Sequence, residues 1–128
     1  MYYEIYLPFP PSVNNYYVKT RYGVHISSKG RKFRTQVAEA VNEQMPGVNI
    51  DHKMLVEVVL YMPDKRIRDL GNYDKALMDS LTLCGLWEDD SLIDQQFFYR
   101  GEVVKGGSVF MRIAEAGPVL KLGQTPPD

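Results

Sequence analysis

The chain has 128 residues, 45% of them apolar, and its formal net charge is −1. This length suits one domain with a single core, and the apolar content is well above that of a disordered protein. The longest apolar runs fall far short of the roughly 20 residues that span a bilayer, and no basic and apolar leader follows Met1. The composition therefore excludes a wholly disordered chain and a membrane-spanning protein, and it predicts a soluble, intracellular protein.

The first segment predicts a strand followed by a hairpin. Residues Tyr2 to Leu7 alternate in polarity, and Pro8-Phe-Pro-Pro11 ends the strand because proline supplies no ladder donor. Residues Tyr16 to Ser27 predict two short strands around a turn at Arg21-Tyr-Gly23. The tip of this hairpin carries positive charge, so it is expected to project rather than pack.

A helix is predicted next. Phe33, Val37, Val41 and Met45 recur at every fourth position and would form one apolar stripe. The serines at 27 and 28 are candidate N-caps, and the Pro-Gly pair at 46 and 47 ends the pattern.

The second half predicts a strand, a helix and two further strands. The segment from Lys53 to Met62 is almost continuously apolar, which indicates a central strand covered on both faces. Asn72 is the expected N-cap of a helix that runs to about Leu83. Residues 92–104 and 108–116 predict two strands that are joined by a hairpin turn at Lys105-Gly-Gly107.

These elements predict a compact, single-domain α+β fold with a mixed β-sheet, two helices and a basic N-terminal hairpin. The domain is expected to occupy residues 1–116. Residues 117–128 are rich in Pro and Gly and predict a flexible C-terminal tail.

Acidic and basic residues around the second helix suit phosphodiester chemistry. Asp69 precedes this helix, Lys75 lies in its first turn and Asp90 follows it. Phosphodiester hydrolysis uses a divalent cation, and Mg²⁺ is typically held by one or two protein carboxylates. A lysine at the amino end of a helix would add positive charge at the scissile phosphate. Taken alone, the same residues also fit solvated loop acids and a surface lysine paired with Asp79.

Five motifs, in this order, resemble the RusA family of Holliday-junction resolvases. They are Pro8-Phe-Pro-Pro-Ser-Val-Asn-Asn15, Met62-Pro-Asp64, Arg68-Asp-Leu-Gly-Asn72 with Lys75, Gly85-Leu-Trp-Glu-Asp-Asp90 and Lys105-Gly-Gly107. The resemblance implies a homodimer that binds four-way junctions and other branched DNA and resolves them by paired, Mg²⁺-dependent nicks, with Mn²⁺ as a substitute. It also implies a role in DNA recombination and repair, a cytoplasmic location and a phage or prophage origin.

The resemblance assigns roles to three residues and leaves one position in conflict. Asp69 and Asp90 match family metal-binding aspartates, and Lys75 matches the catalytic lysine. The family pattern is Asp-Leu-Asp-Asn, but Gly71 stands at the third acid. Three explanations are open: an impaired or inactive natural homologue, a deliberately altered protein, or a neighbouring acid in the vacant ligand position. The neighbouring acids that could take over this ligand position are Asp74 and Asp89.

Positive charge is concentrated in two segments although the overall charge is balanced. The expected DNA-binding residues are Asn14, Asn15, Lys19, Arg21, Lys29, Arg31, Lys32, Arg66, Arg68 and Asn72. The two N-terminal asparagines also fit a simple turn, and the cations also fit a solvated surface. Two other functions are considered: a non-catalytic junction-binding homologue that has lost its metal centre, and an unrelated α+β module for RNA or protein binding.

Overall fold

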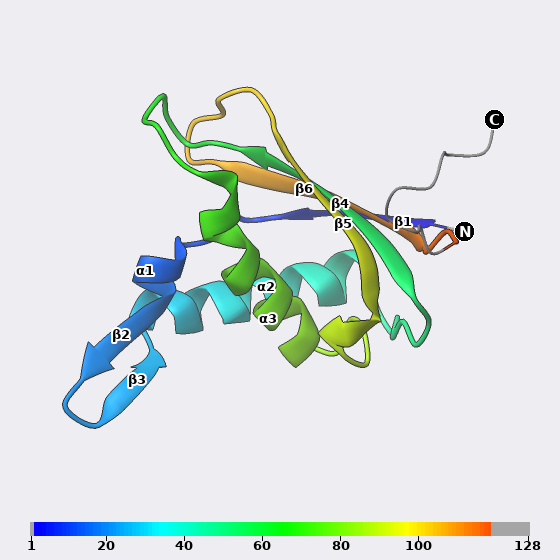
Figure 1. Cartoon of the computed structure of the whole chain (residues 1–128), viewed down its shortest axis with the longest axis horizontal. Helices are drawn as coiled ribbons and strands as arrows, with labels where there is room; N and C mark the ends of the chain where they lie inside the picture. Colours follow the sequence, from blue (N-terminus) through cyan, green and yellow to red (C-terminus); the bar gives the residue numbers. More distant parts are fainter. Residues whose placement is uncertain (1, 119–128) are drawn as a thin grey trace, which may run out of the picture.

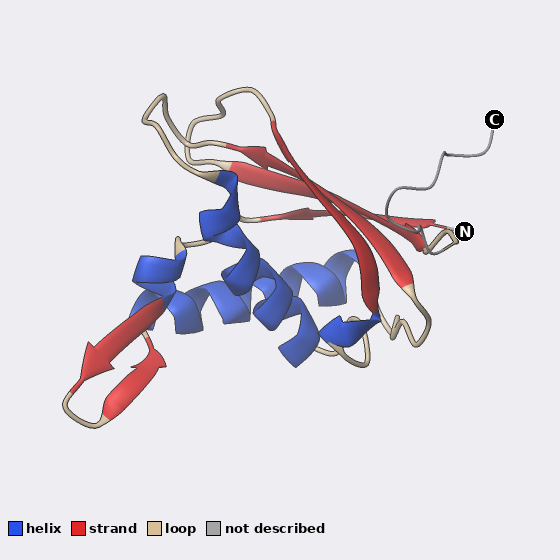
Figure 2. Cartoon of the chain, in the orientation of Figure 1, coloured by secondary structure: helices blue, strands red, loops and turns tan. Residues whose placement is uncertain are grey.

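The computed structural model describes residues 2–118, and its core is a sheet with helices packed on one face (Figures 1 and 2). The main sheet has the strand order β1-β6-β4-β5. Its elements are β1 (Tyr2–Leu7), β4 (Met54–Tyr61), β5 (Ile93–Arg100) and β6 (Ser108–Glu115). Helices α2 (Ser28–Gln44) and α3 (Asp74–Leu83) form the second layer.

The sheet is mixed, as predicted, but two of its strands are connected differently from the expectation. β4 pairs in parallel with β5 and antiparallel with β6, and β6 is also antiparallel to β1. β5 and β6 therefore lie on opposite sides of β4, so the predicted hairpin at Lys105-Gly-Gly107 is wrong. The strongly apolar β4 lies between β5 and β6 and pairs with both. Residues 101–107 connect the end of β5 to the start of β6.

Only one face of β4 is fully covered. Met54, Val56, Val58 and Leu60 are completely buried beneath the helices. The residues between them are half-buried on the opposite face. The expectation of two covered faces is therefore wrong, because both long helices pack on the same side of the sheet.

The stripe and cap predicted for α2 are confirmed. The backbone N–H of Gly30 donates to Ser27 Oγ at 3.0 Å, which identifies Ser27 as the N-cap. Phe33, Val37 and Val41 are buried against the sheet, and the helix ends at Gln44.

The predicted N-terminal hairpin is formed by β2 (Tyr17–Thr20) and β3 (Gly23–Ile26), which make a separate two-stranded sheet. It projects away from both layers (Figure 1). A short helix that was not predicted, α1 (Val13–Tyr16), leads into it. Tyr16 is fully buried and its hydroxyl accepts from Arg34 Nε at 2.7 Å, so the base of the hairpin is tied to α2.

The predicted cap of the second long helix is wrong. A 3₁₀ turn, η1 (Leu70–Tyr73), contains Asn72, and α3 begins only at Asp74 without a side-chain cap. α3 ends at Leu83, as expected. A second 3₁₀ turn, η2 (Asp90–Leu92), then leads into β5.

The predicted tail, residues 117–128, lies largely outside the described residues. Within residues 2–118, no helix combines the length and the apolar character needed to cross a bilayer.

Candidate active site

An open pocket of about 380 Å³ lies between α3, η2 and the first half of β5. It brings together three chain segments that are separate in the sequence. Its lining residues are Asp74, Lys75, Met78, Asp79, Asp90, Ile93 and Gln96. Lys75 and Asp90, two of the residues expected at the active site, therefore share one pocket.

Asp74 is held in the pocket with an unfavourable electrostatic environment. Gln96 Nε2 donates to its Oδ1 at 3.1 Å, across from α3 to β5. Partial burial raises the pKa of Asp74, and the carboxylates of Asp79 and Asp90 raise it further against the opposing effects of Gln96 and Lys75. Positive charge entering the pocket would relieve this repulsion.

Lys75 is held at the pocket by Asp79. Its Nζ lies 3.1 Å from Asp79 Oδ1, one turn further along α3. The Tyr17 hydroxyl donates to the other oxygen of Asp79 at 3.4 Å. The hydrogen bond and charge of Asp79 raise the pKa of Lys75, so its side chain remains an ammonium group at neutral pH. Lys75 is therefore suited to stabilise negative charge or to donate a proton, and not to act as a base.

The structure places Asp69 and Gly71 outside the lining of this pocket. Asp69 is exposed at the start of η1, where its carbonyl accepts from the Asn72 N–H at 3.2 Å. Gly71 is also exposed, and a Cβ at this position would have no atom within 4 Å. The metal-binding role of Asp69 thus stays a prediction.

The two candidate substitutes for the missing acid differ in position. Asp74 lines the pocket, whereas Asp89 does not. The Ser91 hydroxyl donates to Asp89 Oδ2 at 2.7 Å, and this bond is the main cause that lowers the pKa of Asp89. Asp74 is the substitute that the geometry favours.

The donors in the pocket fit a hard divalent cation with few protein ligands. Within residues 2–118, no group of three or more His, Cys, Asp or Glu is arranged to hold a metal ion. Asp74 and Asp90 nevertheless offer two carboxylates, and Gln96 adds an amide. Mg²⁺ is commonly bound by one or two carboxylates, with water and substrate oxygens at its other positions.

The expected DNA-binding residues fall into two groups. The first group lies on α1, the hairpin and the start of α2, and its members are Asn14, Asn15, Lys19, Arg21, Lys29, Arg31 and Lys32, all exposed. The second group is Arg66 and Arg68, in the loop before η1, with the half-buried Asn72. Tyr17, at the base of the hairpin, contacts Asp79, so the first group is connected to the pocket.

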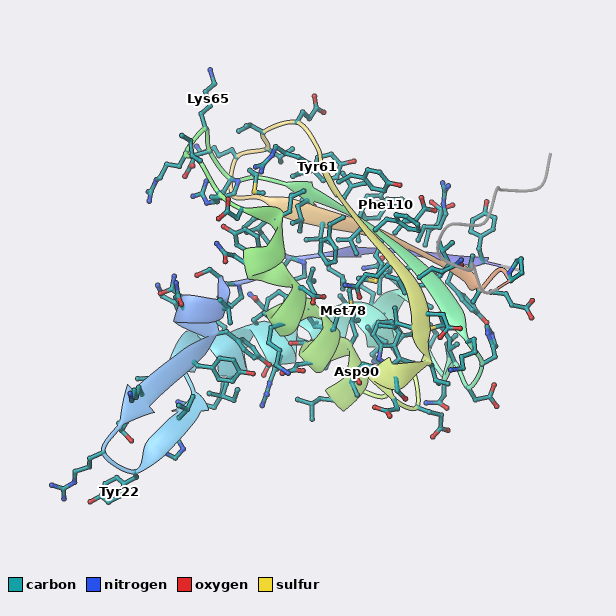
Figure 3. The ribbon with its side chains drawn as sticks, viewed as in Figure 1. Tyr22, Tyr61, Lys65, Met78, Asp90 and Phe110 are labelled. Carbon is teal, nitrogen blue, oxygen red and sulfur yellow. The ribbon has the colours of Figure 1, made fainter. Side chains whose placement is uncertain are left out.

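Figure 3 shows where the hairpin, the basic loop before η1 and Asp90 lie relative to α3. Tyr22 marks the tip of the hairpin, Lys65 projects from the loop near the amino end of α3, and Asp90 lies toward its other end. Sequence reasoning missed Gln96, and it missed the contact of Tyr17 with Asp79. Both roles depend on contacts between distant segments that only the fold creates.

Comparison with known proteins identifies the family. The profile described as Endodeoxyribonuclease RusA matches residues 8–112. The chain belongs to the RusA family. It is 36% identical over 115 residues to the crossover junction endodeoxyribonuclease RusA of Escherichia coli K12, an alignment that covers 90% of this chain and 96% of the relative. The RusA proteins of Enterobacteria phage 82, at 37% identity, and of Shigella sonnei, at 36%, match over the same shares. The family resemblance seen in the sequence is thus confirmed.

Proposed function

We propose that this RusA-family protein is a structure-selective endodeoxyribonuclease that binds four-way DNA junctions and resolves them by paired, Mg²⁺-dependent nicks. The observation that carries the proposal is the pocket in which Lys75, Asp74 and Asp90 meet from two separate segments. The relatives' names, crossover junction endodeoxyribonucleases, supply the substrate class. The proposed setting is DNA recombination and repair in the cytoplasm, with a phage or prophage origin.

The residues of the pocket have distinct proposed roles. Asp90 and Asp74 would hold Mg²⁺ or Mn²⁺, and Asp69 is the further ligand that the family pattern suggests. Such an ion, when bound, stabilises charge on the reacting phosphate and lowers the pKa of an attacking water. Lys75, kept protonated by Asp79, would lie against the phosphate oxygens and protonate or stabilise the leaving oxygen.

Cleavage by this chain is proposed to be weak because Gly71 stands where the family pattern has an acid. Catalytic groups that act as a unit lose most of their rate when one of them is absent. Asp74 is the candidate for partial compensation, since it already lies in the pocket beside Asp90.

A homodimer is proposed to form through the uncovered face of the sheet. Tyr6, Phe110, Val59 and Tyr99 lie in register across all four strands on that face. Tyr6 is 63% exposed and Tyr99 47%. A second copy would cover this aromatic surface, and an exposed apolar patch of this kind commonly marks an interface. Sedimentation of the parent chain and of Tyr99→Glu should give a dimer and a weakened dimer; two monomers would contradict this arrangement.

The second candidate function is a non-catalytic junction-binding protein. Two points favour it: Gly71 stands where the family pattern has an acid, and within residues 2–118 no group of three or more His, Cys, Asp or Glu is arranged to hold a metal ion. A synthetic four-way junction, tested for cleavage with and without Mg²⁺ beside a gel-shift assay, distinguishes the two. Cleavage that requires Mg²⁺ supports the nuclease, whereas binding without any cleavage supports the second function. A preference for RNA over branched DNA would contradict both.

A further inference from the structure

A second pocket, of about 360 Å³, lies beyond the amino end of α3, and four basic residues are part of its lining. It is formed by the loop before η1 and by the end of β5. Its lining includes Met62, Asp64, Lys65, Arg66, Arg68 and Arg100. Four cations thus face one carboxylate, and a concave surface with this charge attracts anions.

Asp64 orders the loop rather than neutralising the pocket. Both oxygens of Asp64 accept from the guanidinium of Arg68, and the Arg66 N–H donates to Oδ1 at 2.9 Å. The Arg68 hydrogen bonds are the main cause that holds the pKa of Asp64 far below its usual range, so this clasp persists throughout the neutral range. The loop is therefore fixed by its own side chains in the absence of DNA.

Arg100 joins the loop to β5 and leaves most of its donors available. Its Nη2 donates to the backbone carbonyl of Arg68 at 2.6 Å. Within residues 2–118, Arg100 has no carboxylate within ion-pair distance, and Lys65 has neither an ion pair nor a side-chain hydrogen bond. A guanidinium has five N–H donors in a planar fork that matches phosphate oxygens.

The basic pocket and the candidate active site are close along the chain. Only residues 69–73 separate Arg68, in the basic pocket, from Asp74, in the candidate active site. The six Cα-to-Cα steps from Arg68 to Asp74 span at most about 20 Å in a fully extended chain, and the 3₁₀ turn η1 makes the distance shorter. One duplex arm that is cut at the active site can therefore reach the basic pocket as well, because phosphates recur along it every few ångströms.

We infer that this pocket is a second DNA-binding site, in which Arg100 and Lys65 bind a backbone phosphate of the arm whose other phosphate lies at the active site. The inference rests on the proposed function and adds two binding residues to it. It also assigns the Asp64 clasp the role of presenting a preformed phosphate site, so that little ordering is needed when DNA binds.

The test is the salt dependence of DNA binding, measured by fluorescence anisotropy with a labelled synthetic four-way junction and no divalent metal. The variants are Arg100→Gln and Lys65→Gln. Each lost phosphate contact should reduce the slope of log affinity against log salt by about 0.9, which is about an eightfold loss of affinity at 0.1 M salt. Lys65→Gln keeps the test independent of folding, because Lys65 makes no side-chain hydrogen bond or ion pair in the described structure.

The matched control is Lys53→Gln. Lys53 is an exposed lysine directly before β4, and Met62, which lines the basic pocket, comes directly after β4. The length of this strand, roughly 26 Å, therefore separates Lys53 from the basic pocket. It should leave the slope unchanged. If the parent binds the junction and both pocket variants keep its slope and affinity, the inference is overturned while the proposed function stands. If the parent does not bind the junction at all, the proposed function itself fails.

Discussion

Lys75 Nζ lies 3.1 Å from Asp79 Oδ1, and the Tyr17 hydroxyl reaches the second oxygen of the same carboxylate from the base of the hairpin. The ammonium group proposed to act on the scissile phosphate is therefore held from one side by its own helix and, through Asp79, by the hairpin. A surface lysine paired at i, i+4 would need no such second support.

Asp79→Asn should lower the pKa of Lys75, because the hydrogen bond and charge of Asp79 are the main causes that raise it above its ordinary value of 10.5. The pair stabilises the fold fully below that ordinary value, and this contribution is lost as pH rises through the raised pKa of the folded state. Its size should be only about 0.3–0.5 kcal/mol, as for other exposed helix pairs.

The measurement is a titration of lysine side chains by NMR in the parent and in Asp79→Asn. Asp94→Asn is the control, since Asp94 pairs with Lys53 and not with Lys75. A Lys75 pKa that stays the same in Asp79→Asn would mean that the pair does not set the charge of this lysine.

Gly71→Asp should raise Mg²⁺-dependent cleavage of a four-way junction by orders of magnitude, because it restores the acid of the family pattern. The side chain will be accommodated, since a Cβ at Gly71 meets no atom within 4 Å and the residue is not among the glycines with positive φ. Gly71→Asn is the matched control, of the same shape but without the charge, and it should give little gain. An unchanged rate beside a robustly active parent would show that the metal site lies elsewhere.

Asp74→Asn tests whether Asp74 replaces the missing ligand. The substitution keeps a side chain that can accept from Gln96 Nε2, so the link between α3 and β5 should survive. We expect it to abolish the residual cleavage of the parent and to have much less effect when Gly71→Asp is also present. Equal losses in both backgrounds, measured as initial cleavage rates, would indicate that Asp74 has its own function in the reaction.

Gly30→Ala should destabilise the fold although alanine is the better helix former. A Cβ at Gly30 would lie 2.7 Å from the carbonyl oxygen of Tyr16 and 2.8 Å from Ile26 Cγ2, where α2 meets the base of the hairpin. Overpacking of this kind typically destabilises the folded state by about 1–3 kcal/mol. The gain in helix propensity from Gly to Ala is about 1 kcal/mol, so the cost of overpacking exceeds it over the upper part of the range of about 1–3 kcal/mol.

Urea unfolding of Gly30→Ala beside Gly71→Ala provides the comparison. Gly71→Ala should stay within about 0.5 kcal/mol of the parent, because the new methyl group points into open space. A Gly30→Ala protein as stable as Gly71→Ala would show that the hairpin base is looser than described.

The local parts of this fold were predictable from the sequence. The four-residue spacing from Phe33 to Val41 gave the buried stripe of α2, and Ser27 gave its cap. The connections were not predictable, because two strands joined by a Gly-Gly turn can pair with each other or with a third strand between them. The choice of β4 as that third strand is a long-range pairing that no local pattern encodes.

The candidate site was predictable to a similar degree. Motif spacing identified Lys75 and Asp90, which the fold brings into one pocket. It also predicted Asn72 as a cap, but the chain forms a 3₁₀ turn there and delays the start of α3 to Asp74. The support from Tyr17 and Gln96 was invisible, because each acts across an interface between distant segments.

The most direct test of the proposed metal centre is anomalous diffraction from crystals soaked in MnCl₂, using the parent and Gly71→Asp. A manganese peak is expected at coordination distance from the carboxylate of Asp90, in the pocket that also contains Lys75, with higher occupancy in Gly71→Asp. Manganese bound elsewhere on the protein, with no peak beside Asp90 in either crystal, would contradict it.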